Sequence, residues 1–257
     1  MIFDFKANRY VAVIGVAALF ALIYTLSDTF NLNVYIIFVV ALVYVYLMAK
    51  YMKYIASIGY RTIHQKLFVN ADAKGYLMSV KQLYKGIKKR KDFEGVKLQN
   101  LIMAHIFAGD FKSARDYHQT FLEAFEDQLD RHESVRFSKG MIEALLELFE
   151  YDKDNFVKKY DKITEILDGM RSDTVAHVRE NPYSIYYMIS QLKTLLIDDG
   201  EVTVDKVKAL TDDANIFLKT SILYSVFKHG FLDKDELGHF ERETQNTMFY
   251  LDEDRVY

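Results

Sequence analysis

The sequence predicts an all-α protein built from a two-helix transmembrane hairpin and a helical domain that follows it. Two uncharged apolar stretches, at about residues 10–27 and 30–49, each approach the ~20 residues that a helix needs to cross a bilayer. The chain has a single proline, Pro182, which favours long helices over a turn-rich β fold. From about residue 60 onward, regularly spaced apolar residues suffice for one hydrophobic core. We therefore expect the hairpin in residues 1–55 and the helical domain in residues 56–257.

The two apolar stretches predict a hairpin because a backbone in hydrocarbon can satisfy its polar groups only within a helix or a closed barrel. Basic residues lie before the first stretch and after the second, at Lys6, Arg9, Lys50 and Lys53, whereas the connecting turn has none. The positive-inside rule then predicts a multi-pass protein of the cell membrane with both termini in the cytoplasm. A cleaved signal peptide is the alternative for the first stretch, although its apolar region exceeds the roughly 7–15 residues of such signals.

Composition limits the classes of function. The chain has no cysteine, so it has neither a disulfide framework nor a cysteine-ligated zinc site, as suits a cytoplasmic domain. Its formal net charge is -3, from 33 basic and 36 acidic residues. A nucleic-acid-binding domain usually carries a basic surface with a recognisable motif, so binding of nucleic acid is not expected.

The clearest local pattern lies between Leu98 and Phe125. Apolar residues at Leu98, Leu101 and Ile102 follow the i, i+3, i+4 spacing of one helix face. The pair Gly109-Asp110 interrupts that helix, and a second helix is predicted from Phe111 onward. The apolar stripe of the second helix comprises Ala114, Tyr117, Phe121, Leu122 and Phe125. The segment therefore predicts a helix–turn–helix hairpin, with the small Ala114 at the close crossing of its two helices.

This segment resembles one tetratricopeptide repeat. The residues that match the family pattern are Leu101, Gly109, Asp110, Phe111 and Ala114. The chain departs from the pattern at Leu98, which takes the usual Trp place, at Ile102 and at His105, and no proline ends the repeat. The resemblance implies an α-solenoid whose stacked hairpins form a groove for a protein partner.

Further helical hairpins are predicted on both sides of this unit. The predicted helix pairs are 62–73 with 77–87, 134–151 with 155–167, 183–196 with 204–210, and 215–228 with 234–247. Residues 170–182 are the expected linker or irregular connection. Hairpins at this spacing fit a short tetratricopeptide-like α-solenoid. A non-repetitive helical bundle is the alternative.

No catalytic, cofactor-binding or metal-binding residue is predicted. Glu236 and His239 have the E-x-x-H spacing of di-iron bundles, but such a site needs two of these pairs and the chain offers one. His105 and His118 are expected to pack within the Leu98–Phe125 hairpin or to line a groove, because no distinctive nucleophile accompanies either. We therefore do not expect an enzyme.

The strongest charge feature is a basic run between residues 81 and 93. It comprises Lys81, Lys85, Lys88, Lys89, Arg90 and Lys91. Basic residues close to a membrane exit can each contribute ~1 kcal/mol of attraction to an anionic leaflet. We therefore expect these side chains to contact anionic lipid, with an ordinary solvated helix end as the alternative.

Together these features predict a membrane-anchored adaptor or scaffold that binds protein partners through its helical domain. A tether of this kind raises the effective concentration of whatever the domain binds. The alternative is a structural subunit of a larger membrane complex, in transport, secretion or envelope synthesis, recognised through its hairpin. The small residues Gly15, Ala17, Ala18 and Ala21 would permit close helix contact in that case.

Overall fold

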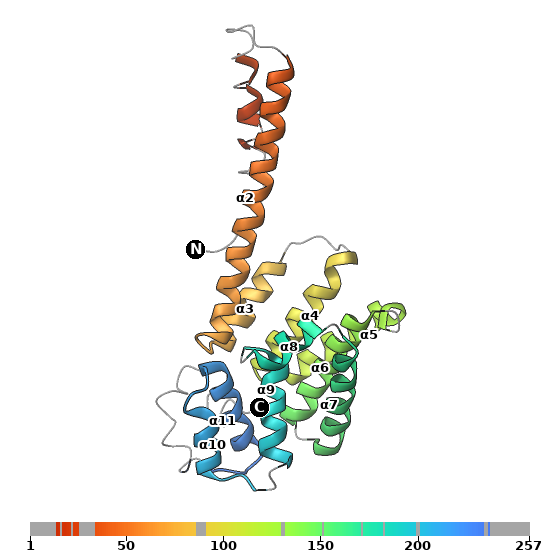
Figure 1. Cartoon of the computed structure of the whole chain (residues 1–257), viewed down its shortest axis with the longest axis vertical. Coiled ribbons are helices and arrows are strands. Elements are labelled where there is room, and N and C mark those ends of the chain that lie inside the picture. The colour runs from red at the N-terminus through yellow and green to blue at the C-terminus, as the bar shows by residue number, and fades with distance from the viewer. Residues whose placement is uncertain are drawn as a thin grey trace. The chain divides into compact units, whose positions relative to one another are not determined.

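The computed structural model describes residues 14–15, 17–21, 23–25, 34–85, 91–129, 132–150, 152–170, 172–181, 183–198, 201–233 and 236. These ranges contain helices and connecting turns, with no strand among them (Figure 1). The chain divides into two compact units, Met1–Ile63 and His64–Tyr257. The prediction of an all-α chain holds for the described residues.

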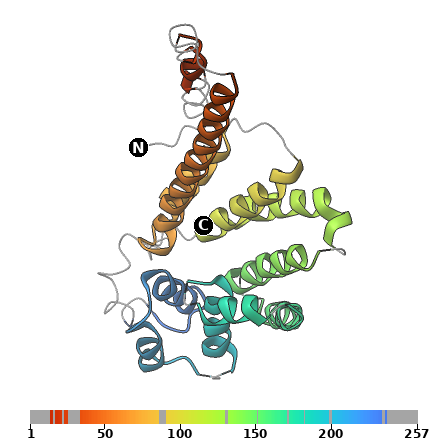
Figure 2. The same ribbon diagram turned by 45° about the horizontal axis from the view of Figure 1, so that its top comes forward.

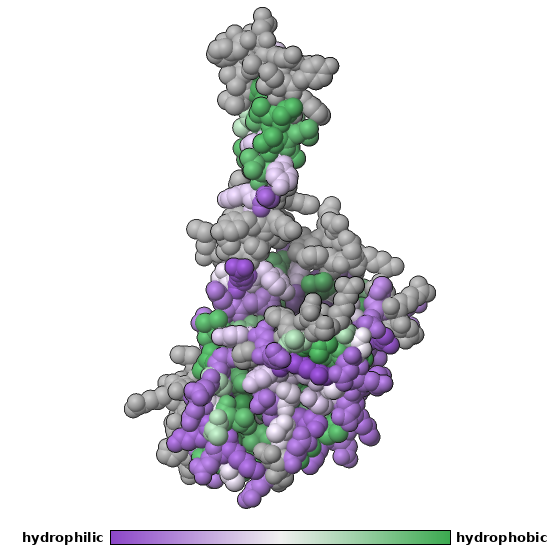
Figure 3. All heavy atoms as spheres, in the orientation of Figure 1, coloured by the Kyte–Doolittle hydropathy of each residue, from purple (hydrophilic) through white to green (hydrophobic). Residues whose placement is uncertain are grey.

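Unit 1 contains helical residues between positions 14 and 25 and most of α2, which runs from Val34 to Phe68. The two segments approach closely at Gly15, where an added Cβ would lie 2.7 Å from the Tyr44 hydroxyl oxygen. Many aliphatic and aromatic side chains of α2 are exposed, and the aliphatic ones give the green, hydrophobic region of this unit in Figure 3. The exposed side chains include Val39, Val40, Leu42, Val43, Val45, Tyr46, Leu47 and Tyr51.

The predicted transmembrane hairpin requires correction. Within the described part of the chain, no helix combines the length and the apolar character that crossing a membrane requires. The stretch assigned to the second span is not a separate helix: from Val34 it belongs to α2, which continues for 35 residues and takes in Lys50, Arg61 and Lys66. Most of the first predicted span lies outside the described residues. The prediction of a two-span protein of the cell membrane is contradicted by this finding.

Unit 2 begins with the last residues of α2 and the turn that follows. Ala71 has a positive φ of 49° in this turn, and Asp72 then caps α3, Ala73–Tyr84. The Asp72 carboxylate accepts a hydrogen bond from the Gly75 amide at 2.8 Å, which satisfies one of the donors left open at a helix start. The turn between α2 and α3 therefore lies before Ala73, whereas the sequence predicted a helix through residue 73 and a turn after it, so the predicted turn is wrong.

The hairpin predicted between Leu98 and Phe125 is present as α4, Lys91–Phe107, and α5, Phe111–Leu129. Figure 2 shows the two helices, in yellow and yellow-green, running side by side. Gly109 takes a left-handed conformation, with φ of 76°, which ends α4. Asp110 then accepts a hydrogen bond from the Ser113 amide at 3.1 Å and starts α5.

A second hairpin consists of α6, Glu133–Glu150, and α7, Lys153–Asp168, close to the predicted boundaries. Asp152 caps α7 by accepting a hydrogen bond from the Asn155 amide at 3.0 Å. The buried Gly140 of α6 lies against Ile163 of α7, where an added Cβ would come within 2.3 Å of the Ile163 Cγ2 atom. The absence of a side chain at Gly140 therefore lets the two helices pack closely.

The expectation of a linker over residues 170–182 is wrong, because Ser172–Glu180 form α8. Its nine residues give too few turns for a clear helical period in the sequence. The chain continues as α9, Ile185–Lys193, which ends in a π-helical turn over Thr194–Asp198. It then forms α10, Val204–Thr211, and α11, Ile216–Lys228.

The packing of α11 departs from the predicted solenoid. In an open stack of repeats each unit contacts only its neighbours, but α11 packs on both α6 and α9. The ring of Phe217 lies 5.3 Å from that of Phe107 in α4, measured between centroids, and the Tyr224 ring lies 5.8 Å from that of Phe149 in α6. The α3–α7 region has the sequential packing of helical hairpins, whereas the later helices return to α6 as in a bundle.

A candidate binding cleft between α4, α6 and α9

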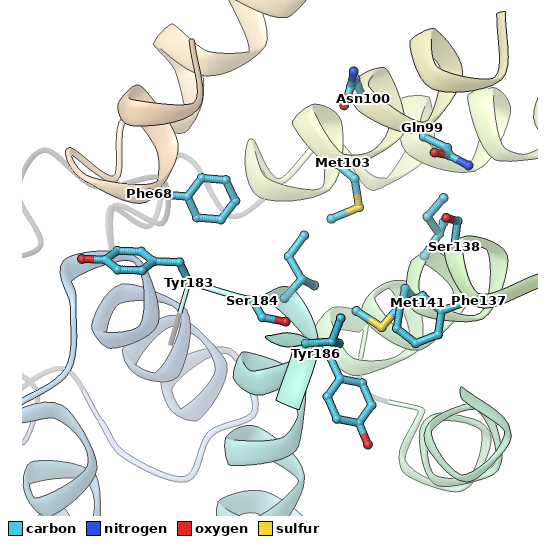
Figure 4. Close-up of a pocket in the computed structure, with 13 residues that line it drawn as sticks. Phe68, Gln99, Asn100, Met103, Phe137, Ser138, Met141, Tyr183, Ser184 and Tyr186 are labelled. Carbon is cyan, nitrogen blue, oxygen red and sulfur yellow. The ribbon is translucent and has the colours of Figure 1, made fainter. Parts of the chain in front are cut away.

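A cavity of about 340 Å³ lies within unit 2 where α4, α6 and the start of α9 meet. We call it the α4–α6–α9 cleft (Figure 4). Its lining consists of Phe68, Gln99, Asn100, Met103, Phe137, Ser138, Met141, Ile142, Val178, Tyr183, Ser184, Ile185 and Tyr186. This volume falls within the roughly 300–1,000 Å³ of small-ligand sites.

Helical spacing explains how α4 and α6 each contribute one face to the cleft. Positions i, i+1 and i+4 of α4 supply Gln99, Asn100 and Met103. The same positions of α6 supply Phe137, Ser138 and Met141, each 38 residues after its counterpart in α4. In Figure 4, Met103 and Met141 reach into the cleft from their two helices.

Other faces of these helices are taken up within their own hairpins. The ring of His105 in α4 lies 5.3 Å from that of Tyr117 in α5, between centroids. Gly140 of α6 lies against Ile163 of α7. Because each hairpin is held through these contacts, the cleft is formed between elements that are already packed.

The polar groups of the cleft fall into two classes. The Asn100 Nδ2 donates a hydrogen bond to the Tyr84 hydroxyl at 2.6 Å, which fixes that amide. The side chains of Gln99, Ser138 and Ser184 make no hydrogen bond to any residue that the structure describes. The cleft therefore combines an apolar lining with three side chains that can still donate and accept hydrogen bonds.

Tyr186 forms a rigid part of the lining. Its hydroxyl points away from the cleft in Figure 4 and lies 2.9 Å from the Thr164 Oγ1 atom. Its ring stacks on Tyr160 at 5.8 Å between centroids, and the Lys193 ammonium lies 5.3 Å from the centroid of the Tyr160 ring. Burial raises the pKa of the Tyr160 hydroxyl, which therefore stays neutral in this cluster.

The buried histidines lie outside the cleft, in the hairpins. The His105 Nδ1 atom lies 2.8 Å from the Asp110 Oδ2 atom, so the pair links the end of α4 to the cap of α5. The His118 Nε2 atom lies 4.0 Å from the Glu143 carboxylate, which the Lys159 ammonium contacts at 2.5 Å. Burial lowers the pKa of both imidazoles. The His105 contact joins α4 to α5, and the His118 contacts join α5 to α6 and α7. Both histidines therefore have a structural role.

The structure places the predicted residues as follows. Leu101 and Ala114 are buried, and the ring of Phe111 lies 6.4 Å from that of Phe149, so the residues that carry the repeat resemblance lie at the helix turn and in the core. In the basic run, Lys81 and Lys85 are exposed at the end of α3, and Lys91 begins α4. Lys88, Lys89 and Arg90 lie outside the described residues, as does His239. Contact of the run with lipid stays a prediction.

Sequence reasoning did not find the cleft. Its lining comes from four separate stretches of the chain, and no motif joins them. One signal was present in the sequence: Met103 of α4 and Met141 of α6 lie 38 residues apart, each in the first helix of one of two successive hairpins. If each hairpin were isolated, the helix faces that bear them would be exposed to solvent and would be expected to carry polar side chains instead of methionine.

No protein-family model, curated protein or solved structure matches the chain.

Proposed function

We propose that this chain is a protein-interaction domain that binds a segment of a partner protein in the α4–α6–α9 cleft. The observation that carries the proposal is the cleft itself, a largely apolar cavity of about 340 Å³ whose lining includes side chains that make no hydrogen bond to a described residue. Clefts between packed helical hairpins suit a peptide segment because their walls are rigid while their lining side chains adapt. Within this proposal, the α4–α5 hairpin and the α6–α7 hairpin act as two successive tetratricopeptide-like repeats.

A photo-crosslinking experiment tests the proposal. Tyr183 is 50% exposed and lines the cleft, so a benzoylphenylalanine placed there would capture a partner bound in it. Met78 of α3 is 71% exposed outside the cleft and provides the matched control position. A second variant fills the cleft by the substitution Ser138→Trp. If this variant does not fold, Gln99→Trp is used in its place.

We expect a distinct protein to be crosslinked from position 183, absent from position 78 and lost when the cleft is filled. The circular dichroism spectrum and melting temperature of each filled variant show whether the fold is retained. Identical products from positions 183 and 78, or products that persist in a well-folded filled variant, would rule the proposal out.

A second candidate function rests on unit 1. The exposed apolar side chains of α2, from Val39 to Tyr51, are dense enough to mark a contact surface with another protein. In this case the chain is a structural subunit of a larger assembly. Replacing Leu42 and Leu47 together by Ser should remove a partner that binds unit 1, and it should leave the crosslink from position 183 unchanged.

A further inference from the structure

We infer that the α4–α6–α9 cleft selects an uncharged peptide segment. The segment inserts one Leu, Met or Phe side chain into the cleft and offers a backbone amide group to Gln99. This inference rests on the proposed function and deepens it, because it names the chemistry of the partner. The occupant is a segment of another protein.

The charge of the lining selects for a neutral partner. None of the thirteen residues that line the cleft is acidic or basic. Charged groups on α6 nearby have other partners: Lys139 lies 3.7 Å from Glu143, and Arg136 lies 3.9 Å from Glu133. Moving a charged side chain from water into an apolar site without a partner is costly. The electrostatic complement of this lining is therefore a neutral segment.

The apolar residues of the lining can hold one apolar side chain of the bound segment, which we call the anchor. Two thioethers, of Met103 and Met141, and two phenylalanine rings, of Phe68 and Phe137, line the cavity together with two tyrosines. The Phe68 ring is fixed because it packs on Phe217 at 4.7 Å between centroids. Methionine side chains are flexible and polarizable, so they can adapt to Leu, Met or Phe and make favourable contacts with an aromatic ring. The cavity thus has fixed walls at Phe68 and Tyr186 and adaptable ones at Met103 and Met141.

The side-chain carboxamide of Gln99 can pair with a backbone amide of the bound segment. A glutamine carboxamide has a carbonyl acceptor and an NH₂ donor, which together match the N–H and C=O of a peptide backbone. Gln99 makes no hydrogen bond to a described residue, whereas its neighbour Asn100 is bound to Tyr84. Ser138 on α6 supplies a further donor and acceptor. Gln99 is therefore the residue of the cleft best able to pair with a backbone amide.

The experiment is selection of phage-displayed random heptapeptides on the immobilised full chain, with removal of binders to the Ser138→Trp chain. The selected peptides are then synthesised with acetylated and amidated ends, and their affinities are measured for the wild type and for Gln99→Leu. Gln119→Leu, on the exposed surface of α5, is the matched control variant.

We expect a consensus with one Leu, Met or Phe and no charged residue on either side of it. Asp beside the anchor should weaken binding at least ~10-fold, and Gln99→Leu should weaken it ~3–10-fold, as the loss of one net hydrogen bond does. Gln119→Leu should have no effect. A charged consensus, or equal affinities for the two leucine variants, would overturn the inference while leaving the cleft as the binding site. If instead every peptide that binds the wild type is lost in the removal step on the Ser138→Trp chain, the proposed function is overturned.

Discussion

The His229 Nε2 atom lies 2.8 Å from the backbone carbonyl oxygen of Leu148, 81 residues earlier in the chain. Because a carbonyl only accepts, the imidazole carries its proton on Nε2 and donates it. This bond joins the end of α11 to the end of α6 and fixes the return of the last described helix to the middle of unit 2. Burial lowers the pKa of His229 to about 4.

This depressed pKa predicts a loss of stability in mild acid. The ordinary histidine pKa is 6.5, so between that value and about 4 the unfolded chain binds a proton that the folded chain does not. The contribution of neutral His229 to the free energy of unfolding is therefore fully present above pH 6.5. It is lost as the pH falls from 6.5 towards 4. The slope from His229 should stay below the ~1.4 kcal/mol per pH unit of one fully linked proton, since the ring is partly exposed.

Urea denaturation at several pH values between 7.5 and 4.5 measures this slope. His229→Gln keeps a donor for the Leu148 carbonyl but cannot titrate, so it should flatten the profile. A residual slope should remain, because burial also lowers the pKa values of His64, His105 and His118. His132→Gln, at an exposed site, is the control. Equal slopes for the wild type and His229→Gln would contradict the assignment.

The contact between His105 and Asp110 predicts a second effect. Asp110→Ala removes the cap of α5, which is worth ~1 kcal/mol, and leaves the buried Nδ1–H of His105 without its acceptor. The expected total is a destabilisation of about 2 kcal/mol. Asp110→Asn retains one acceptor oxygen and should cost less. Asp116→Ala on the exposed face of α5 should cost under ~0.5 kcal/mol, and a similar cost for Asp110→Ala would show that the cap contributes little.

Gly109 and Gly169 form a matched pair for testing backbone conformation. Gly109 has φ of 76° and nothing within 4 Å of an added Cβ, so Gly109→Ala introduces strain without a clash. Gly169 has φ of -77° and ordinary contacts. We expect Gly109→Ala to cost about 1–2 kcal/mol and Gly169→Ala to be neutral or slightly stabilising. Chemical denaturation of the two variants measures the difference, and equal stabilities would contradict the left-handed turn.

Helix breaks that depend on neighbouring residues were the features that the sequence could predict. The turn at Gly109-Asp110 was predicted at its true place and the α6–α7 hairpin close to its true limits, whereas α4 begins at Lys91, seven residues before the predicted Leu98. The end of α11 before Gly230, with its φ of 68°, was predicted for the same reason. Helix α8 was missed because a nine-residue segment has little periodicity to detect.

Features that depend on distant contacts were not predictable. The packing of α11 on α6 rests on pairs such as Tyr224 with Phe149, which no spacing rule links. The cleft depends on the same arrangement, since Phe68 of its lining is held by Phe217 of α11. The apolar stretch after Val34 was wrongly taken as a separate membrane span, because a window of this length does not show that the helix continues into charged residues.

The α6–α7 contact gives the sharpest test of packing. Gly140→Ala places a Cβ within 2.3 Å of the Ile163 Cγ2 atom, and both residues are buried, so the two helices must move apart or a rotamer must change. Overpacking of this kind typically costs ~1–3 kcal/mol. Ile163→Ala removes the opposing atom but opens a cavity, at ~2–5 kcal/mol.

The double variant Gly140→Ala/Ile163→Ala separates the clash from the general preference of a helix for alanine over glycine. If the clash dominates, the second substitution relieves the first, and the double variant is more stable than the sum of the single effects by ~0.5–3 kcal/mol. Additive effects would show that α6 and α7 do not approach at Gly140. A double-mutant cycle by urea denaturation at pH 7.5 decides between them, at a pH where the buried histidines stay neutral in both states.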